Sequence, residues 1–384
     1  MNRKRIAAGF RRLEAAVLAA GTLWIVCVTA GSDTAASALS ALGEALPIGA
    51  LRWELGDLWT NDQLSPAAVM AIQESPLLLA ARPAVAEVWD RQDPPEKIPE
   101  ADEELISVPV EETPVDIPAA ADNGVPAKTL IPTDPSGYTV CGKTYINNST
   151  EHALSLTTLQ EPFAAELTGE EPQVLIIHTH GSEAYTPAED ADIVWSGDHR
   201  TTDSRYNVVK VGDEMAEVFG EAGISVLHDR TLYDYPAYSG AYDRSLEAIE
   251  SYLAQYPSIQ FVLDIHRDAI ADADGNQYKV VSVIDGMGTA AQLTLVVGSD
   301  GSGLTHPDWM ENLKLAAAIQ EELLADFPTL MRPVLLRNSR YNQHATTGSL
   351  LVEVGAAGNS PEEALLAGKL FAEGMAAVLQ AGTE

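Results

Sequence analysis

The chain has 384 residues, 46% of them hydrophobic, and a formal net charge of -33. That apolar fraction suffices for one sizeable core, which excludes a wholly disordered protein. So acidic a surface repels phosphate backbones, and basic residues cluster only near the N-terminus, so we expect no nucleic-acid partner. The two cysteines, Cys27 and Cys141, provide neither a disulfide framework nor a thiolate metal site. Any bound metal must therefore be held by histidines and carboxylates.

An uncharged, mostly apolar segment at residues 15–32 is long enough to cross a membrane as one helix. The basic residues that precede it are Arg3, Lys4, Arg5, Arg11 and Arg12. Under the positive-inside rule this tail is cytoplasmic, and everything after residue 32 is extracytoplasmic. The alternative is a cleaved signal peptide, because residues 28–30 are suitable for a signal peptidase. We predict an uncleaved anchor, which makes this a single-pass protein of the cell membrane.

Two segments separate the anchor from the rest of the chain. Residues 33–81 are rich in Ala and Leu and predict a juxtamembrane helical segment. Residues 82–135 contain ten of the 22 prolines, with 13 acidic against four basic residues. This composition cannot bury enough apolar surface to offset the entropy lost on ordering. We therefore predict a disordered, acidic, Pro-rich linker, followed by a catalytic domain at 136–384.

Apolar runs alternate with amphipathic stretches throughout the predicted domain. Strands are expected at 174–178, 224–228, 259–265, 278–284, 292–298, 333–337 and 349–354, and helices at 207–222, 239–256, 307–327 and from 361 onward. A succession of strand, helix and strand favours right-handed crossovers between parallel strands. We predict an α/β domain with an open, largely parallel twisted sheet and helices on both faces.

Polar side chains stand at the ends of three predicted strands, where open α/β sheets bind their ligands. His178 ends the first of these strands, His180 and Glu183 follow it, and His266 follows another. Two imidazoles and one carboxylate form a ligand set typical of catalytic Zn²⁺, with the fourth position left to water. In a helical turn, residues three apart such as His180 and Glu183 share one face. We predict His180, Glu183 and His266 as ligands, with His178 and Asp203 as the alternatives.

A hydrolytic zinc site also needs a carboxylate that accepts a proton from the activated water. Glu353 is the candidate, because an acid inside the apolar run 350–354 is costly without a partner or a function. Arg267 is a candidate clamp for a substrate carboxylate. An ordinary ion pair between Arg267 and Asp264 or Asp268 would explain the same residue.

The chain resembles a known family in the segments LIIHTHGSEAYTP, RTTDSRYNVVKVGDEMAEVF, FVLDIHRDA and SRYNQHATTGSLLVEVGAAGNS, and in their order. It is similar to the stage II sporulation protein P family of membrane-anchored cell-wall hydrolases, relatives of zinc N-acetylmuramoyl-L-alanine amidases. The resemblance spans roughly residues 136–384. It implies a bound Zn²⁺, cleavage of the amide between N-acetylmuramic acid and the stem peptide of peptidoglycan, and endopeptidase action on cross-links. It also implies work at the sporulation septum during engulfment, beside stage II sporulation proteins D and M.

The resemblance assigns site residues one at a time. His180 and His266 fall where the related amidases place their first and second histidine ligands, and Glu353 falls on their late strand glutamate. The carboxylate ligand of those amidases lies further downstream, which favours Asp203, whereas the His-x-x-Glu spacing of zinc carboxypeptidases favours Glu183. We favour Glu183. The alternative function is a catalytically silent, membrane-tethered wall-binding scaffold on the same fold.

Overall fold

The computed structural model describes residues 59–60, 63–64, 111–114, 123–132, 134–169, 171–272 and 274–382. Met1–Lys97 and Ile98–Glu384 are separate units. In the first unit the structure describes only β1 (Trp59–Thr60), which pairs antiparallel with β2 (Gln63–Leu64). The predicted anchor lies outside the described residues, and so does the predicted helical segment apart from these two short strands.

An eight-stranded sheet organises the second unit, with the strand order β5-β6-β13-β12-β14-β9-β7-β8. Its strands are β5 (Thr139–Cys141), β6 (Thr144–Asn148), β7 (Val174–Ile177), β8 (Val226–His228), β9 (Phe261–Asp268), β12 (Leu293–Val297), β13 (Val334–Leu336) and β14 (Gly348–Ala356). Strands β8, β7, β9 and β14 are mutually parallel. Strand β12 pairs antiparallel with β14 but parallel with β13, which in turn is parallel to β6.

The α/β class is confirmed, and the sheet is mixed where a largely parallel one was expected. The strands that a single helix connects are parallel, as the crossover rule requires: β7 with β8, and β12 with β13. The chain reverses between β9 and β12 and again between β13 and β14. At the first of these places it leaves the sheet through a hairpin and at the second through a loop, and neither connection contains a described crossover helix that would fix the direction of return.

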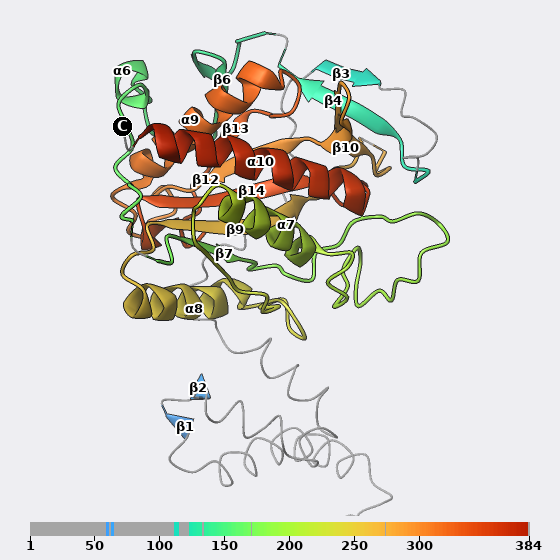
Figure 1. Cartoon of the computed structure of the whole chain (residues 1–384), viewed down its shortest axis with the longest axis horizontal. Coiled ribbons are helices and arrows are strands. Elements are labelled where there is room, and N and C mark those ends of the chain that lie inside the picture. The colour runs from blue at the N-terminus through green and yellow to red at the C-terminus, as the bar shows by residue number, and fades with distance from the viewer. Residues whose placement is uncertain are drawn as a thin grey trace, which may run out of the picture. The chain divides into compact units, whose positions relative to one another are not determined.

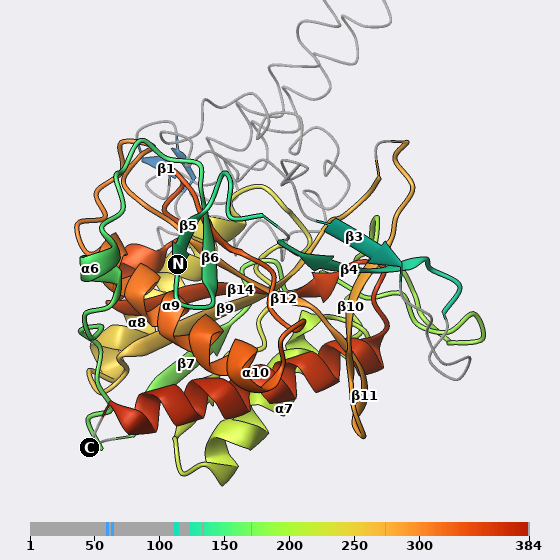
Figure 2. The ribbon, with the colours of Figure 1, turned by 90° about the horizontal axis from the view of Figure 1, so that it is seen from above.

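Helices cover both faces of the sheet, as predicted. On one face lie α7 (Val208–Glu221), α9 (Trp309–Asp326) and α10 (Pro361–Ala381), and Figures 1 and 2 show α7 and α10 side by side. The other face carries α8 (Ala241–Gln255), while the short helix α6 (Leu156–Leu159) packs near α9. Alternate residues of a strand point to opposite faces, so Val174 and Ile176 enter the large core and Leu175 and Ile177 the smaller core under α8.

Local capping explains where the helices begin. Helix α7 starts after Asn207, whose side chain accepts a hydrogen bond from the Val209 amide at 3.1 Å. Helix α10 starts with a capping box between Ser360 and Glu363, and Pro361 occupies its first turn. The 3-10 turn η3 (Gln343–Ala345) lies in the loop between β13 and β14.

A second, four-stranded sheet has the order β11-β10-β4-β3. Its strands are β3 (Glu111–Pro114), β4 (Ala127–Ile131), β10 (Lys279–Ile284) and β11 (Gly288–Ala291). The expectation of a disordered linker as far as residue 135 is therefore wrong for β3 and β4. Buried Gln292 explains why β4 is held in the fold. Its side chain accepts a hydrogen bond from the Leu130 amide at 2.8 Å and donates one to the Leu130 carbonyl at 3.1 Å.

One helix of the described residues, α10, is long and apolar enough to cross a membrane. Half of its most apolar stretch is buried, and its inward residues, including Leu370, Phe371 and Met375, belong to the main core. We therefore interpret α10 as a core helix of the folded unit.

Candidate metal centre

The register of β9 and β14 places the candidate residues at one edge of the sheet. His266 on β9 lies directly opposite Glu353 on β14. Asp264 and His266 share the strand face of Val262, which packs under α8, so their side chains face that side. The segment after β7 reaches the same edge, because β7 pairs with β9 in parallel. Groups far apart in the sequence are thus brought together at the carboxyl ends of three strands.

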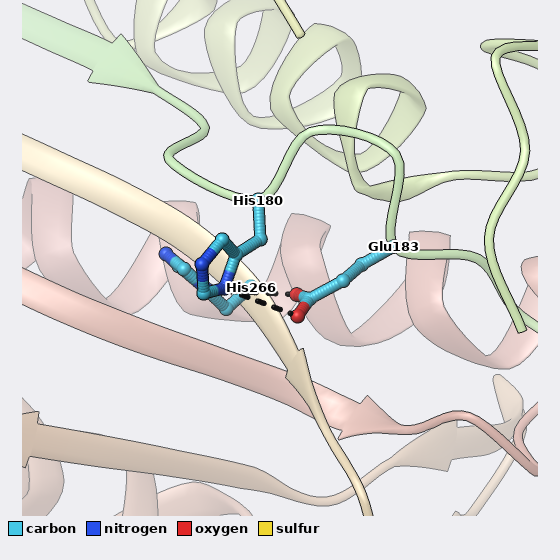
Figure 3. Close-up of side chains that lie close together, drawn as sticks. All are labelled: His180, Glu183 and His266. Carbon is cyan, nitrogen blue, oxygen red and sulfur yellow. Dashed lines mark ion pairs between the residues drawn. The ribbon is translucent and has the colours of Figure 1, made fainter. Parts of the chain in front are cut away.

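His180, Glu183 and His266 form a compact cluster in which one ligand atom of each lies within 4.8 Å of the others. Figure 3 shows both imidazoles next to the carboxylate. His180 Nδ1 lies 3.4 Å from Glu183 Oε1, and His266 Nδ1 lies 3.5 Å from Glu183 Oε2. The two predicted histidines and the favoured carboxylate therefore meet. Two nitrogen donors and one anionic oxygen donor suit Zn²⁺.

His266 has a second carboxylate on its far side, which favours a ligand role. Its Nε2 lies 3.0 Å from Asp264 Oδ1. Asp264 is held by Thr179, whose amide donates to Oδ1 at 2.8 Å and whose hydroxyl donates to Oδ2 at 2.6 Å. A proton on Nε2 facing Asp264 leaves the Nδ1 lone pair directed at the cluster, as outer carboxylates do for metal-binding histidines. The donor set and its support fit a zinc ion.

Charged neighbours keep Glu183 ionised. Burial opposes ionisation, but the charge of Arg267 and the imidazoles of His180 and His266 outweigh it and hold the Glu183 pKa well below its usual range. The Arg267 amide donates to Glu183 Oε2 at 3.1 Å, and the Arg200 guanidinium lies 3.5 Å from Oε1. A buried anion fixed in this way is prepared to bind a cation.

The Arg267 side chain has a different environment from the one that a substrate clamp would need. Its guanidinium is buried and donates to three main-chain carbonyls, those of Ala184 at 3.3 Å, His199 at 3.1 Å and Asp268 at 3.4 Å. No ion pair with the carboxylates of Asp264 or Asp268 is formed in the described structure. Arg267 thus fixes the loop around Glu183 and supplies positive charge to that carboxylate.

The two alternative ligands lie outside the cluster. Asp203 pairs with Arg205, whose guanidinium donates to Oδ2 at 2.6 Å. His178 faces away from the cluster: its Nδ1 lies 3.1 Å from the Ile265 carbonyl oxygen, and its Nε2 lies 2.8 Å from Nε2 of His228. Of the candidate ligands, Glu183 and His180 thus lie in the cluster, and their role as ligands stays a prediction.

Glu353 faces the cluster from β14 and is poorly neutralised. Burial, followed by repulsion from Asp268 and Glu183, raises the pKa of Glu353 to about 8, although His266 and Arg332 act in the opposite direction. Its Oε2 is buried and accepts no hydrogen bond from the described residues. A carboxylate with a free acceptor and a raised pKa is suited to exchange protons near neutral pH.

The sequence did not reveal the residues that support the cluster. Asp234 accepts from the Ser182 amide at 3.0 Å and pairs with Arg200 at 2.7 Å, which fixes the turn that carries Glu183. Tyr238 stacks on His180 with ring centroids 4.6 Å apart. Asp234 and Tyr238 lie in a loop before α8 with no metal-ligand spacing, so only the folded chain brings them to the site.

Two comparisons by sequence match this chain to one protein family. The stage II sporulation protein P profile matches residues 119–376. Stage II sporulation protein P of Bacillus subtilis (strain 168) is 27% identical over 209 residues, which are 52% of this chain and 49% of that protein. The chain thus spans about half the length of this curated relative.

Among solved structures, the amidase AmiC2 of Nostoc punctiforme is 14% identical, with a TM-score of 0.33, covering 56% of this chain and 99% of AmiC2. The CwlD amidase of Clostridioides difficile, solved with the GerS lipoprotein, is 18% identical with the same TM-score, covering 55% and 96%. The profile match covers well over half of the sequence, and the chain therefore belongs to the stage II sporulation protein P family.

Proposed function

We propose that the protein is a zinc-dependent peptidoglycan hydrolase. One observation carries the proposal: His180, Glu183 and His266 converge within 4.8 Å of one another, beside the unneutralised carboxylate of Glu353. These residue types and their burial support hydrolysis, whereas a scaffold would have no need for an isolated buried acid next to three metal-binding groups.

The three clustered residues would hold the ion and Glu353 would move the proton. Bound Zn²⁺ supplies a Lewis acid that activates water and polarises a carbonyl group. Asp264 keeps the His266 ring in one orientation, and Arg267 keeps Glu183 anionic. Glu353 accepts a proton from the attacking water and returns it to the leaving nitrogen as the C–N bond breaks.

Family membership supports the choice of substrate. We propose the amide between N-acetylmuramic acid and the stem peptide as the bond cleaved, with peptide cross-links as a second target. The site of action would be the sporulation septum during engulfment, outside the cytoplasmic membrane, with residues 15–32 as the anchor. Stage II sporulation proteins D and M are the proposed partners.

Digestion of purified cell wall by the full chain, with and without a chelator, tests this function. We expect the wall to release free amino groups of stem peptides without any new reducing sugar ends. This activity should be lost with chelator and recovered on addition of Zn²⁺. Metal analysis of the same preparation should find one zinc per chain. Wall digestion that is unaffected by chelator, in a protein without zinc, would contradict the proposal.

A further inference from the structure

Tyr242 lies over the two imidazoles of the metal centre. It stands in the first turn of α8, whose N-terminus faces the carboxyl edge of the sheet. Its ring meets the His180 ring edge-on, with centroids 5.4 Å apart and an interplanar angle of 76°. It is nearly parallel to the His266 ring, at 6.5 Å and 14°. The phenol thus lies beside both candidate histidine ligands, close enough for the charges of Asp264, Glu353 and Glu183 to act on it.

The hydroxyl of Tyr242 is uncommitted, unlike those of Tyr185 and Tyr233. Within the described part of the chain it makes no hydrogen bond. The hydroxyl of Tyr185 donates to the Val354 carbonyl at 3.0 Å, and that of Tyr233 donates to Asp229 at 2.5 Å. Tyr242 is half-buried, and its hydroxyl oxygen does not belong to the buried polar atoms that lack a partner. The hydroxyl is therefore open to solvent, which leaves a donor available to a ligand.

Hydrogen bonds fix Tyr242 in place. Its carbonyl accepts from Asn342 Nδ2 at 2.8 Å, and the same amide lies 3.2 Å from Ser245 Oγ. Ser245 Oγ lies 2.7 Å from Thr179 Oγ1, and Thr179 donates to Asp264. The helix turn that carries the phenol is therefore tied, bond by bond, to the carboxylate behind a candidate metal ligand. Fixed donors of this kind need no reorganisation during a reaction.

A tyrosine hydroxyl is protonated at neutral pH, because its ordinary pKa is about 10. Burial, followed by the charge of Asp264, shifts the pKa of Tyr242 upward from that value. The phenol is therefore a hydrogen-bond donor at neutral pH. A neutral donor can stabilise negative charge that develops on a substrate oxygen, and it does so without giving up its proton.

We infer that Tyr242 is a catalytic residue whose hydroxyl donates a hydrogen bond to the carbonyl oxygen of the scissile amide as that oxygen becomes negative. The inference rests on the proposed hydrolase function. Water oxygen bonds to the carbonyl carbon while one water proton passes to Glu353. The C–N bond then breaks, the carbonyl double bond re-forms, and the proton moves from Glu353 to the leaving nitrogen. Tyr242 retains its own proton throughout.

The test is Tyr242→Phe in the full chain, assayed on soluble N-acetylmuramoyl peptides. Loss of one donor to a developing oxyanion typically lowers kcat by about 10²- to 10³-fold. We expect that loss with an unchanged KM and an unchanged zinc content. Tyr252→Phe, which removes a hydroxyl from the same helix away from the site, is the matched control and should keep wild-type kcat.

A binding measurement separates a catalytic from a structural role. A phosphinate analogue of the substrate carries a tetrahedral anionic centre, so its affinity should fall in Tyr242→Phe by the same factor as kcat. Affinity for the intact substrate, measured in a Glu353→Gln background, should stay constant. A Tyr242→Phe variant that keeps kcat within about twofold of wild type, or that loses zinc, would overturn the inference alone. A wild-type chain that cleaves neither soluble peptides nor wall would overturn the proposed function as well.

Discussion

His178 and His180 are two residues apart, yet they enter different environments. His180 faces α8 and the cluster with Glu183 and His266. His178 faces α7, where a Cβ atom added to Gly212 would lie 2.7 Å from its Nε2. A continuous strand would place both imidazoles on one face. Strand β7 ends at Ile177, so the turn that follows separates them.

The charges around each imidazole distinguish the surroundings of His266 from those of His178. Around His266, Asp264 and Glu183 overcome burial and raise its pKa well above the ordinary value. Around His178 the effect of burial dominates and lowers the pKa to about 4. Its neighbour His228 is lowered to about 3 by burial and by the nearby imidazole. The acidic surroundings of His266 therefore favour a cation there, either a proton or a metal ion that displaces it, whereas His178 and His228 are held neutral.

The largest expected effect is the difference in zinc content between variants of His266 and His178. His266→Ala should lose zinc and wall digestion together, because a catalytic site left with two protein ligands holds the ion poorly. His178→Ala should retain zinc, because its ring nitrogens face Ile265 and His228. Zinc stoichiometry of both purified variants measures this. Zinc loss in His178→Ala with retention in His266→Ala would reverse the assignment.

Glu353→Gln tests the proton acceptor beside the cluster. The amide keeps the shape of the carboxylate but cannot take a proton from water. Removal of a general base typically lowers kcat by about 10²- to 10⁴-fold. Zinc content and wall binding should remain at the wild-type level. Full activity of this variant, or loss of its zinc, would show that Glu353 has another role.

A smaller effect is expected where the two carboxylate candidates are compared. Glu183→Gln should lower zinc occupancy, because it replaces the anionic oxygen donor between the two imidazoles. Asp203→Asn should leave occupancy unchanged, since its carboxylate pairs with Arg205 outside the cluster. Metal titration of both variants gives the comparison. Zinc loss confined to Asp203→Asn would transfer the third ligand to that residue.

The sequence predicted the elements whose periodicity is strong. The helix expected at 207–222 is α7 (Val208–Glu221), and the strand expected at 174–178 is β7 (Val174–Ile177). Strands β4 and β11 were not predicted, because each is short and depends on pairing with β10. No local pattern contains that information. The direction of β12 depends on a chain path that hydrophobic periodicity does not encode.

The sequence indicated which residues lie together at the strand ends, and their roles as ligands and proton acceptor stay predictions. His180, Glu183 and His266 form one cluster and Glu353 lies opposite His266, but Arg267 was assigned a clamp role that its contacts with carbonyl groups do not support. The roles of an arginine and of Tyr242 depend on which groups surround them after folding. Supporting residues on a loop and a helix start have no signature of their own in the sequence.

The smallest expected effect concerns His178, His228 and the stability of the fold in acid. The pKa values of His178 and His228 in the folded protein are about 4 and about 3, whereas an unfolded histidine titrates near pH 6.5. Between pH 6.5 and 4 the unfolded chain therefore binds protons that the folded chain does not. The free energy of unfolding must fall as the pH falls through this range, by an amount on the order of a few kcal/mol.

His228→Gln removes one of the two titrating groups and should make that decline shallower. Urea unfolding of the full chain at pH 7.5, 6 and 5, with chelator present so that metal release does not contribute, measures the slope. At pH 7.5 both imidazoles are neutral in the folded and the unfolded chain, so the variant and wild type differ there only by packing. Equal slopes below pH 6.5 would show that the His178 and His228 pair is not the source of acid sensitivity. A shallower slope in the variant, with zinc binding intact, would confirm that the buried His178 and His228 pair makes the fold sensitive to acid and acts independently of the metal centre.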